Sequence, residues 1–425
     1  MTIKNIPNMS NRSLPAVLIM VCFYMFLFIE RPWESIRYLN GIPIERTFAV
    51  IMIFWAFTVG RIKIVSSSIN KWVYGLLALH FILAPFAQNS SSAVDQGIEY
   101  AKVVVIYLLM LSVVDDEASL KVIIKVYIFS MMIYVLHSLW EYHNGSYVWD
   151  MGIYRMVGVG RSYNQPNAFG ASLVLSIPFV YTLFRLETKS ILRILYTVYF
   201  GSVVLCLVLT GSRSSSIAFV FLLLLWVMLQ HGKRKIVIFV VTLIAFSTIW
   251  ISMPAEKQVR IKSIWDKDAG PANAQKSTDG RKLGFIAGWE MFRHAPFTGI
   301  GAGGDNFVEY RMEHLDGIPE QSHNLYAEVL SAFGVVGAFF FIGLVTSTWR
   351  GCLKVRRFYL QSEMEKSFCF NISGSIIICL ILLLLLGLSG HNFYRPLWLW
   401  MSAWVGSMMQ IINQKQDALY KLQNF

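Results

Sequence analysis

Residues 368–388 read FCFNISGSIIICLILLLLLGL, and this stretch decides the class of fold. A helix needs roughly 20 mostly apolar residues to cross the hydrocarbon core of a bilayer. The segment has that length and contains no charged side chain. A run of this kind predicts a membrane-spanning helix.

The rest of the chain repeats this pattern. Its 425 residues are 56% hydrophobic and only 15% charged, whereas soluble domains carry about 25% charged residues. This composition excludes an ordinary cytosolic enzyme, a disordered chain and a nucleic-acid-binding protein. The apolar runs predict an all-α polytopic membrane protein with about twelve spanning helices. The predicted spans are Leu14–Ile29, Thr47–Gly60, Trp72–Ala87, Tyr100–Val114, Leu120–Trp140, Asn167–Phe184, Ile191–Thr210, Ser214–Gln230, Ile236–Met253, His323–Trp349, Phe368–Leu388 and Leu397–Ile412.

Lys and Arg are distributed unevenly among the loops between these spans. If the N-terminus is cytoplasmic, most of them fall in cytoplasmic loops, as in the run Lys233-Arg234-Lys235. Because short cytoplasmic loops are enriched in Lys and Arg, we expect both termini in the cytoplasm. The same bias accounts for much of the net charge of +12 without an acidic ligand. The five cysteines are isolated, which indicates neither a disulfide framework nor a zinc site.

One long polar segment, residues 254–322, interrupts the apolar pattern. Its length of roughly 70 residues is too great for a passive connection. We therefore expect three parts: spans one to nine in residues 1–253, a small subdomain in 254–322 on the non-cytoplasmic side, and spans ten to twelve in 323–425. Aromatic residues such as Trp289 and Phe292 would let part of the subdomain rest in the membrane interface.

Polar residues gather at four places on the side where this subdomain is expected. They are GRSYNQPN at 160–167, TGSRSSS at 210–216, DGR at 279–281 with the glycine-rich GIGAGG at 299–304, and SHNLYAE at 322–328. The glycine-rich run follows no predicted strand, so it is a weak nucleotide signal. Close packing of the backbone is its better interpretation.

Arg213 is the strongest candidate ligand of an anion. It stands near the membrane edge where Gly211 and several serines open a helix, so a fixed cation is combined with free backbone N–H groups. Arg161 and Arg281 add positive charge on the same side, and three arginines suit a diphosphate. The alternative is that these side chains extend to lipid headgroups or cap carbonyl groups.

His323 is the candidate general base. It is expected to start the tenth span, where the positive end of the helix dipole disfavours a charged imidazole and a neutral ring can accept a proton. A histidine that only caps its helix is the alternative. His391 and Arg395, before the last span, form a weaker group that could orient substrate. Outer carboxylates such as Asp305 lack the compact spacing of a cation site, so we expect a metal-independent mechanism without a cofactor.

The motifs in this order resemble those of the bacterial O-antigen ligase and O-antigen polymerase family. The resemblance rests on the windows 160–167, 210–214 and 322–334, on Gly280-Arg281, and on the Pro-x-x-Gly-x-Gly run at 296–301. It covers roughly residues 158–337, and the layout of spans extends it along the chain. It implies a fold related to membrane glycosyltransferases of the GT-C class.

The resemblance also implies an activity and its residues. Such proteins transfer a glycan from undecaprenyl diphosphate to an acceptor at the periplasmic face of the bacterial inner membrane. In the ligases the acceptor is the lipid A-core of lipopolysaccharide. Arg213, Arg281 and Arg161 then correspond to diphosphate-binding residues and His323 to the catalytic histidine. The residues expected to support the site are Gln165, Asn167, Ser212, Asn324, Tyr326, His391 and Arg395.

Two rival functions stay open at this point. A polymerase that extends the lipid-linked glycan, or a ligase with a protein acceptor, would use the same chemistry. A flippase or transporter of lipid-linked glycans would also need about twelve spans and arginines in the membrane. Transporters usually place their polar site near the bilayer midplane, whereas the polar motifs here lie on one side, which favours a transferase.

Overall fold

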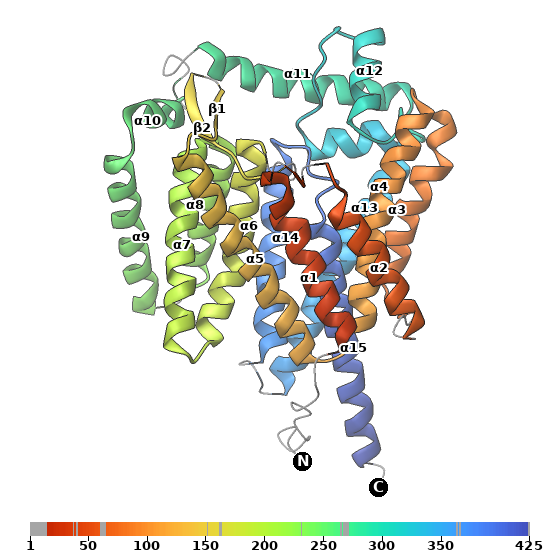
Figure 1. Cartoon of the computed structure of the whole chain (residues 1–425), viewed down its shortest axis with the longest axis vertical. Helices are drawn as coiled ribbons and strands as arrows, with labels where there is room; N and C mark the ends of the chain where they lie inside the picture. The colour runs from red at the N-terminus through yellow and green to blue at the C-terminus, as the bar shows by residue number, and fades with distance from the viewer. Residues whose placement is uncertain are drawn as a thin grey trace.

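The computed structural model describes residues 15–36, 38–39, 41–59, 65–150, 152–160, 164–230, 232–263, 266, 272–362, 364 and 367–423. It is a bundle of mostly antiparallel helices (Figure 1). The helices are α1 (Ala16–Glu30), α2 (Ile44–Thr58), α3 (Asn70–Ile82), α4 (Ser90–Val113), α5 (Glu117–His143), α6 (Pro166–Leu186), α7 (Ser190–Thr210), α8 (Arg213–Met228), α9 (Gly232–Ser252), α10 (Ala255–Lys262), α11 (Ala272–His294), α12 (Gly304–His314), α13 (Leu325–Gln361), α14 (Phe368–Gly387) and α15 (Leu397–Gln423), with short 3-10 turns at Pro32–Ser35 and Ala84–Phe86.

Each of the twelve predicted spans coincides with a helix of the bundle. Within the described residues, seven helices are long and apolar enough to cross a membrane: α1, α4, α5, α6, α7, α13 and α14. The apolar helix α8 is shorter, at 16 residues. A multi-pass, helical membrane protein is therefore confirmed, while the number twelve and the GT-C class stay predictions.

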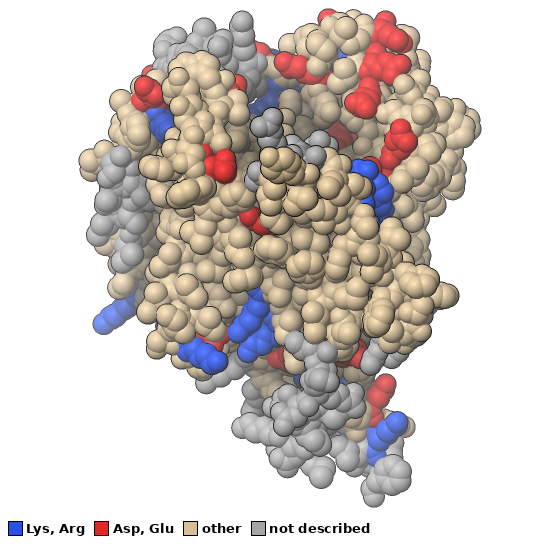
Figure 2. Space-filling model, viewed as in Figure 1, with Lys and Arg blue, Asp and Glu red and all other residues tan. Residues whose placement is uncertain are grey.

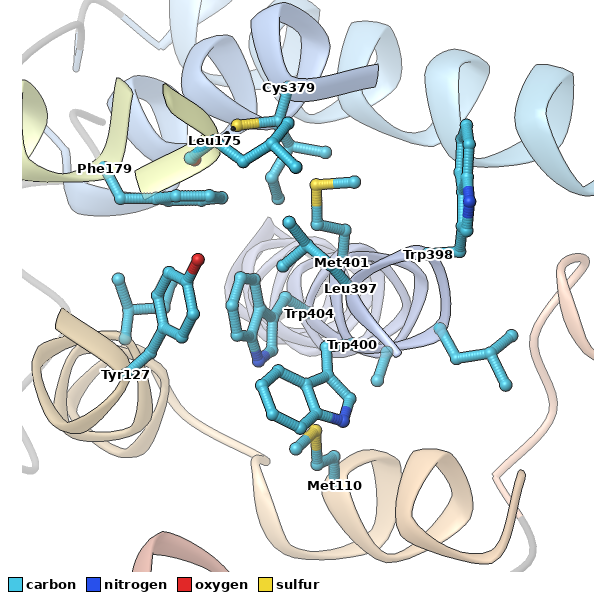
Figure 3. Close-up of a cluster of buried hydrophobic side chains, with 14 of the residues drawn as sticks. Met110, Tyr127, Leu175, Phe179, Cys379, Leu397, Trp398, Trp400, Met401 and Trp404 are labelled. Carbon is cyan, nitrogen blue, oxygen red and sulfur yellow. Dashed lines mark hydrogen bonds between the residues drawn. The ribbon is translucent and has the colours of Figure 1, made fainter. Parts of the chain in front are cut away.

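Helix α15 forms the centre of the bundle, where it contacts α4, α5, α13 and α14. Its first ten residues, 397–406, are all buried. Figure 3 shows Trp404 between Tyr127 of α5 and Phe179 of α6, with ring centroids 5.8 and 5.5 Å away. Aromatic rings that meet edge to face stabilise such a core beyond the area they bury. Protein rather than lipid surrounds this part of α15. Its side chains can therefore be large aromatic residues, such as tryptophan, that pack against the neighbouring helices.

Two short strands were not expected from the sequence, so the all-α prediction missed one feature. Strands β1 (Tyr147–Asp150) and β2 (Ile153–Met156) form an antiparallel hairpin between α5 and α6. Gly152 in the connecting turn has φ +78°, a conformation that glycine adopts without strain. Strands of four residues are too short to show a clear alternation of polar and apolar side chains in the sequence. The hairpin is held instead by the helices beneath it.

The hairpin, α10, α11 and α12 all lie at one end of the bundle, which we call the loop end (Figure 1). The beginning of α1 and the end of α15 lie at the opposite end. In Figure 2 the surface at the loop end is hollowed and basic side chains line the hollow, while acidic side chains gather toward α12. The start of α1 and the end of α15 thus lie on the side away from the candidate polar motifs.

The described part of segment 254–322 contains the helices α10, α11 and α12, and α11 and α12 contribute to a small apolar core of its own. Ala287 and Met291 of α11 pack with Ile300, Phe307 and Tyr310. Helix α11 crosses the loop end and contacts α13. The described helices of this segment therefore lie over the loop end of the bundle.

The glycine-rich run packs backbone against backbone, as its sequence suggested. Helix α13 is interrupted at Gly334, whose φ is +62° and ψ −158°, and Gly299 lies against this break with φ +66°. The amide of Ile300 donates to the carbonyl of Ser331 over 2.8 Å. A Cβ atom on Gly299 would collide with the Ala332 carbonyl group. The run thus joins segment 254–322 to the kinked helix.

Substitution of Gly299 by alanine is expected to destabilise the protein by about 2 kcal/mol or more, because alanine disfavours positive φ and its methyl group meets backbone atoms. Thermal unfolding in detergent measures the change. Gly317→Ala is the matched control, because that residue also has positive φ but open space around it. Equal effects of the two substitutions would contradict the packing role of Gly299.

Candidate active site

Arg155 of β2 ties the first two polar motifs together. Its side chain is 1% exposed, and Nε donates to the Thr210 carbonyl oxygen over 2.9 Å. One Nη donates to Asn167 Oδ1 over 2.9 Å and the other to Asp150 Oδ2 over 2.6 Å. A guanidinium group offers five donors in a rigid plane, so one side chain fixes the hairpin, the start of α6 and the end of α7.

The turn between α7 and α8 presents Arg213. Gly211 takes the left-handed conformation that ends α7, and Ser212 caps α8 by accepting from the Ser215 amide. Ser212 Oγ also donates to Asn167 Oδ1 over 2.8 Å. Arg213 is therefore the first residue of α8, at the positive end of the helix dipole. The helix start expected after Gly211 is present, and Gly211 and Ser212 alone separate α7 from α8.

Helix α10 brings two further cations to this turn. Arg260 Nε donates to the Gly211 carbonyl over 2.8 Å, and Lys257 Nζ donates to the Leu209 carbonyl over 2.8 Å. Both side chains are buried. The carbonyl groups at the end of α7 carry partial negative charge and attract cations. The two residues hold α10 against the turn that carries Arg213.

Arg281 of α11 lies near the same cluster. No hydrogen bond or ion pair within the described residues engages its guanidinium group. Burial, together with the nearby charges of Arg213 and Arg155, lowers its pKa to about 10. A desolvated cation near other cations is costly unless an anion neutralises it.

The surplus of positive charge extends to Arg260. Burial lowers its pKa to about 9, with Arg155 and Arg213 adding to the decrease and Asp150 opposing it. Asp150 pairs with Arg155 and opposes the decrease at Arg260, so positive charge predominates among the described side chains Arg155, Arg213, Arg260 and Arg281. An anion with more than one charge fits this arrangement.

Helix α11 also positions the segment that carries His323. Gly284, one turn after Arg281, packs directly on Ser322, where a Cβ atom would come within 2.7 Å of the Ser322 carbonyl oxygen. Gly288 packs in the same way on Ala327. These contacts place Arg281 beside His323, close enough that the arginine charge lowers the pKa of the histidine.

The expectation that His323 starts a helix is wrong. Asn324 is the capping residue, since its Oδ1 accepts from the amides of Tyr326 and Ala327, and α13 begins at Leu325. His323 precedes the cap with φ +48°. Burial is the main cause that lowers its pKa, followed by Arg281 and Arg311, while Glu320 opposes them. A neutral imidazole is thus favoured by its surroundings rather than by a helical position.

His391 lies next to His323, with ring centroids 5.1 Å apart. It belongs to the turn between α14 and α15. Arg395 in the same turn donates to Ser172 Oγ over 2.9 Å and to the Ala168 carbonyl over 3.2 Å. The structure therefore brings His391 to the candidate base, while Arg395 fastens the turn to α6.

The other predicted site residues either form hydrogen bonds that hold the fold or lie away from the cationic cluster. Asn324 Nδ2 donates to the Leu388 carbonyl over 3.1 Å, and the Tyr326 hydroxyl donates to the Leu384 carbonyl over 3.1 Å. Asn167 and Ser212 belong to the network around Arg155. Gln165 is exposed at the start of α6, with no side-chain cap bond. Arg161 lies outside the described residues.

Sequence reasoning missed Arg155, Arg260 and Lys257. All three fall in segments expected on the outer side, where the positive-inside rule disfavours Lys and Arg. A Lys or Arg on the side where this rule disfavours it was therefore the signal in the sequence that could have revealed these residues. Their partners are backbone carbonyl groups and residues distant in sequence, which no local motif reveals.

Comparisons with known proteins bear on residues at the centre of this cluster. Residues 198–342 match the model of a protein family described as O-antigen ligase. The search of curated proteins gave no match. The matched segment contains Arg213, Arg260, Arg281 and His323. This match lies on the chain segment that supplies the cations and the candidate base, so that segment is similar to proteins of the O-antigen ligase family.

Proposed function

We propose that the protein transfers a glycan from undecaprenyl diphosphate to the lipid A-core of lipopolysaccharide at the periplasmic face of the inner membrane. The observation that carries this proposal is the approach of Arg281 to both Arg213 and His323. A cluster of buried cations next to a neutral imidazole suits a reaction in which a diphosphate leaves and a hydroxyl attacks. The similarity of residues 198–342 to the O-antigen ligase family supports the same class of reaction.

The arginines stabilise the leaving group. As the bond between the anomeric carbon and the diphosphate breaks, negative charge develops on the phosphate oxygens. Preorganised guanidinium groups neutralise this charge in a site partly shielded from water. Arg213 and Arg281 contact the diphosphate, with Arg161 as a further contact, and no divalent ion is needed for this step.

His323 acts as the general base. Its neutral ring takes the proton from the acceptor hydroxyl as the oxygen attacks the anomeric carbon from the face opposite the diphosphate. A single displacement inverts the configuration at that carbon. The energy comes from the donor bond, so the reaction runs without ATP. Both lipid substrates reach the site laterally between spans, beneath segment 254–322.

The orientation of the site supports this proposal. The start of α1 and the end of α15 lie at the end of the bundle opposite the cationic cluster (Figure 1). If the positive-inside rule places the termini in the cytoplasm, the cluster faces the periplasm.

The product of the purified protein tests the function. The protein is incubated in lipid vesicles with undecaprenyl-diphosphate-linked glycan, with and without lipid A-core, and with a chelator in a parallel series. We expect glycosylated lipid A-core as the product, no lengthening of the lipid-linked chains, and equal rates with and without the chelator. Chain extension without lipid A-core would favour the polymerase, translocation without a new bond the flippase, and a rate restored by added magnesium a metal mechanism.

The rate is expected to depend on pH in a bell shape. His323 must be neutral, and its pKa is lowered from the ordinary 6.5, so activity falls only as the pH drops below 6.5. Arg260 and Arg281 must be charged, with pKa values of about 9 and about 10, so kcat/KM falls as the pH rises through this range. Rates with purified substrates between pH 5 and 11 measure both limits. An acid limit above 7 would contradict the role of His323.

A further inference from the structure

The imidazole rings of His323 and His391 contact each other at the loop end. Their centroids are 5.1 Å apart and the rings are inclined by 38°. The two residues come from different parts of the chain, one before α13 and the other after α14. Such a contact persists only if both backbone segments are fixed.

The turn that carries His391 is fixed by Glu328. The Glu328 carboxylate accepts hydrogen bonds from the backbone amides of Phe393, over 3.1 Å, and Asn392. Glu328 lies on the first turns of α13, five residues after His323, so the same helix end holds both histidines. A side chain that accepts from two backbone amides of one turn holds that turn in place.

Two other contacts hold the same turn from its sides. Asn392 Nδ2 donates to the Leu383 carbonyl of α14 over 2.9 Å. Arg395 binds Ser172 Oγ on α6. The turn is therefore attached to α6, α13 and α14, and its place against His323 is built into the bundle.

We propose that His391 is a positioning residue, held by Glu328, that orients the His323 ring and keeps water away from it. The proposal rests on the proposed function, because orientation matters only if His323 accepts a proton. Misplacement of a catalytic group by about 1 Å costs on the order of 10²-fold in rate.

The groups that face His323 explain why a neutral neighbour is useful. Arg281 of α11 and Arg311 of α12 disfavour a charged ring, and Glu320 favours it. His391 keeps an exposed surface, while partial desolvation of its ring lowers its pKa, with the charges of His323 and Arg395 acting in the same direction. His391 thus stays uncharged at neutral pH and contributes packing without adding positive charge.

Two substitutions of His391 separate packing from chemistry. His391→Ala removes the ring, so kcat is expected to fall about 10- to 100-fold, with donor KM within about twofold and the acid limit shifted up toward 6.5 as water reaches His323. His391→Phe keeps a ring of similar shape and is expected to restore most of the lost rate and the original acid limit. His314→Ala, an exposed histidine on α12, is the control.

Glu328→Gln tests the anchor of the turn. The amide keeps the size of the side chain but offers one accepting oxygen in place of two, which weakens its hold on the turn. We expect kcat to fall toward that of His391→Ala, again with donor KM unchanged. Size-exclusion profiles and thermal unfolding show whether each variant is folded.

A readout without turnover keeps this test separate from that of the function. Diethyl pyrocarbonate modifies neutral imidazole, so the rate of His323 labelling against pH, measured by mass spectrometry on the full chain in lipid discs, reports the titration of His323. We expect the midpoint to rise in His391→Ala and to stay unchanged in His391→Phe.

Either of two results overturns the proposal. One is an His391→Ala protein with unchanged labelling midpoint and kcat. The other is an His391→Phe protein as defective as His391→Ala, because a ring nitrogen rather than the packing of the ring would then be required. If the unmodified protein transfers no glycan, the proposed function fails, while labelling still reports whether His391 shields His323.

Discussion

Replacement of His323 by alanine is expected to lower the rate of glycan transfer about 10²- to 10⁴-fold, the contribution of a well-placed general base. Donor binding should persist, because Arg213 and Arg281 stay in place. The acceptor hydroxyl would then have to lose its proton without a base, so kcat falls while donor KM changes little. Single-turnover kinetics with purified donor and acceptor measure the chemical step.

His323→Asn is the matched variant, because the backbone of this residue has φ +48°. Asparagine tolerates this left-handed conformation far better than alanine, so the asparagine protein keeps the local fold without a base. Both variants should be equally slow. A fast asparagine variant would mean that His323 serves only the backbone conformation, and the assignment of the base would fail.

Arg281→Gln is expected to have two opposite effects. Donor KM should rise at least about tenfold, because a charge-assisted contact to phosphate is lost. The melting temperature of the ligand-free protein should increase by about 2 °C or more. The gain arises because the substitution removes a buried cation that is repelled by Arg213 and Arg155. Active sites often keep such destabilising charges.

Two further variants sharpen this test. Arg281→Lys should rescue the KM only partly, because an ammonium group cannot make the planar, two-point contact of guanidinium with phosphate. Arg293→Gln on the same helix is the control, since Arg293 is exposed and pairs with Glu290, and it should change neither quantity. A lower melting temperature for Arg281→Gln would show that Arg281 stabilises the fold, and it would contradict a role in which the residue binds an anion at a cost in stability.

The sequence was a good guide to the helices and to part of the site. Long apolar runs such as 368–388 predict helices reliably, because a backbone in lipid must satisfy its hydrogen bonds within the helix. The turn Gly211-Ser212-Arg213 was also predictable, since its glycine and serine have defined roles at helix ends. The start of α13 was misplaced, because a histidine in the left-handed conformation before the cap leaves no local pattern.

The role of Arg155 could not be predicted. Its three partners lie 5, 12 and 55 residues away in the chain, and only packing of the hairpin on α6 and α7 brings them together. Arg281 was expected at the site, but the reason for its place beside His323 is the contact of Gly284 with Ser322. Neither contact has a signature in the local sequence.

The amino-acid sequence by itself determined that the chain is a helical membrane protein and which polar motifs could carry charge and a base, because hydrophobicity and side-chain chemistry are local properties. The tertiary structure decided that Arg155, Arg260 and His391 join these motifs. Their places depend on contacts between helices far apart in the chain, and such contacts form only when the whole bundle packs.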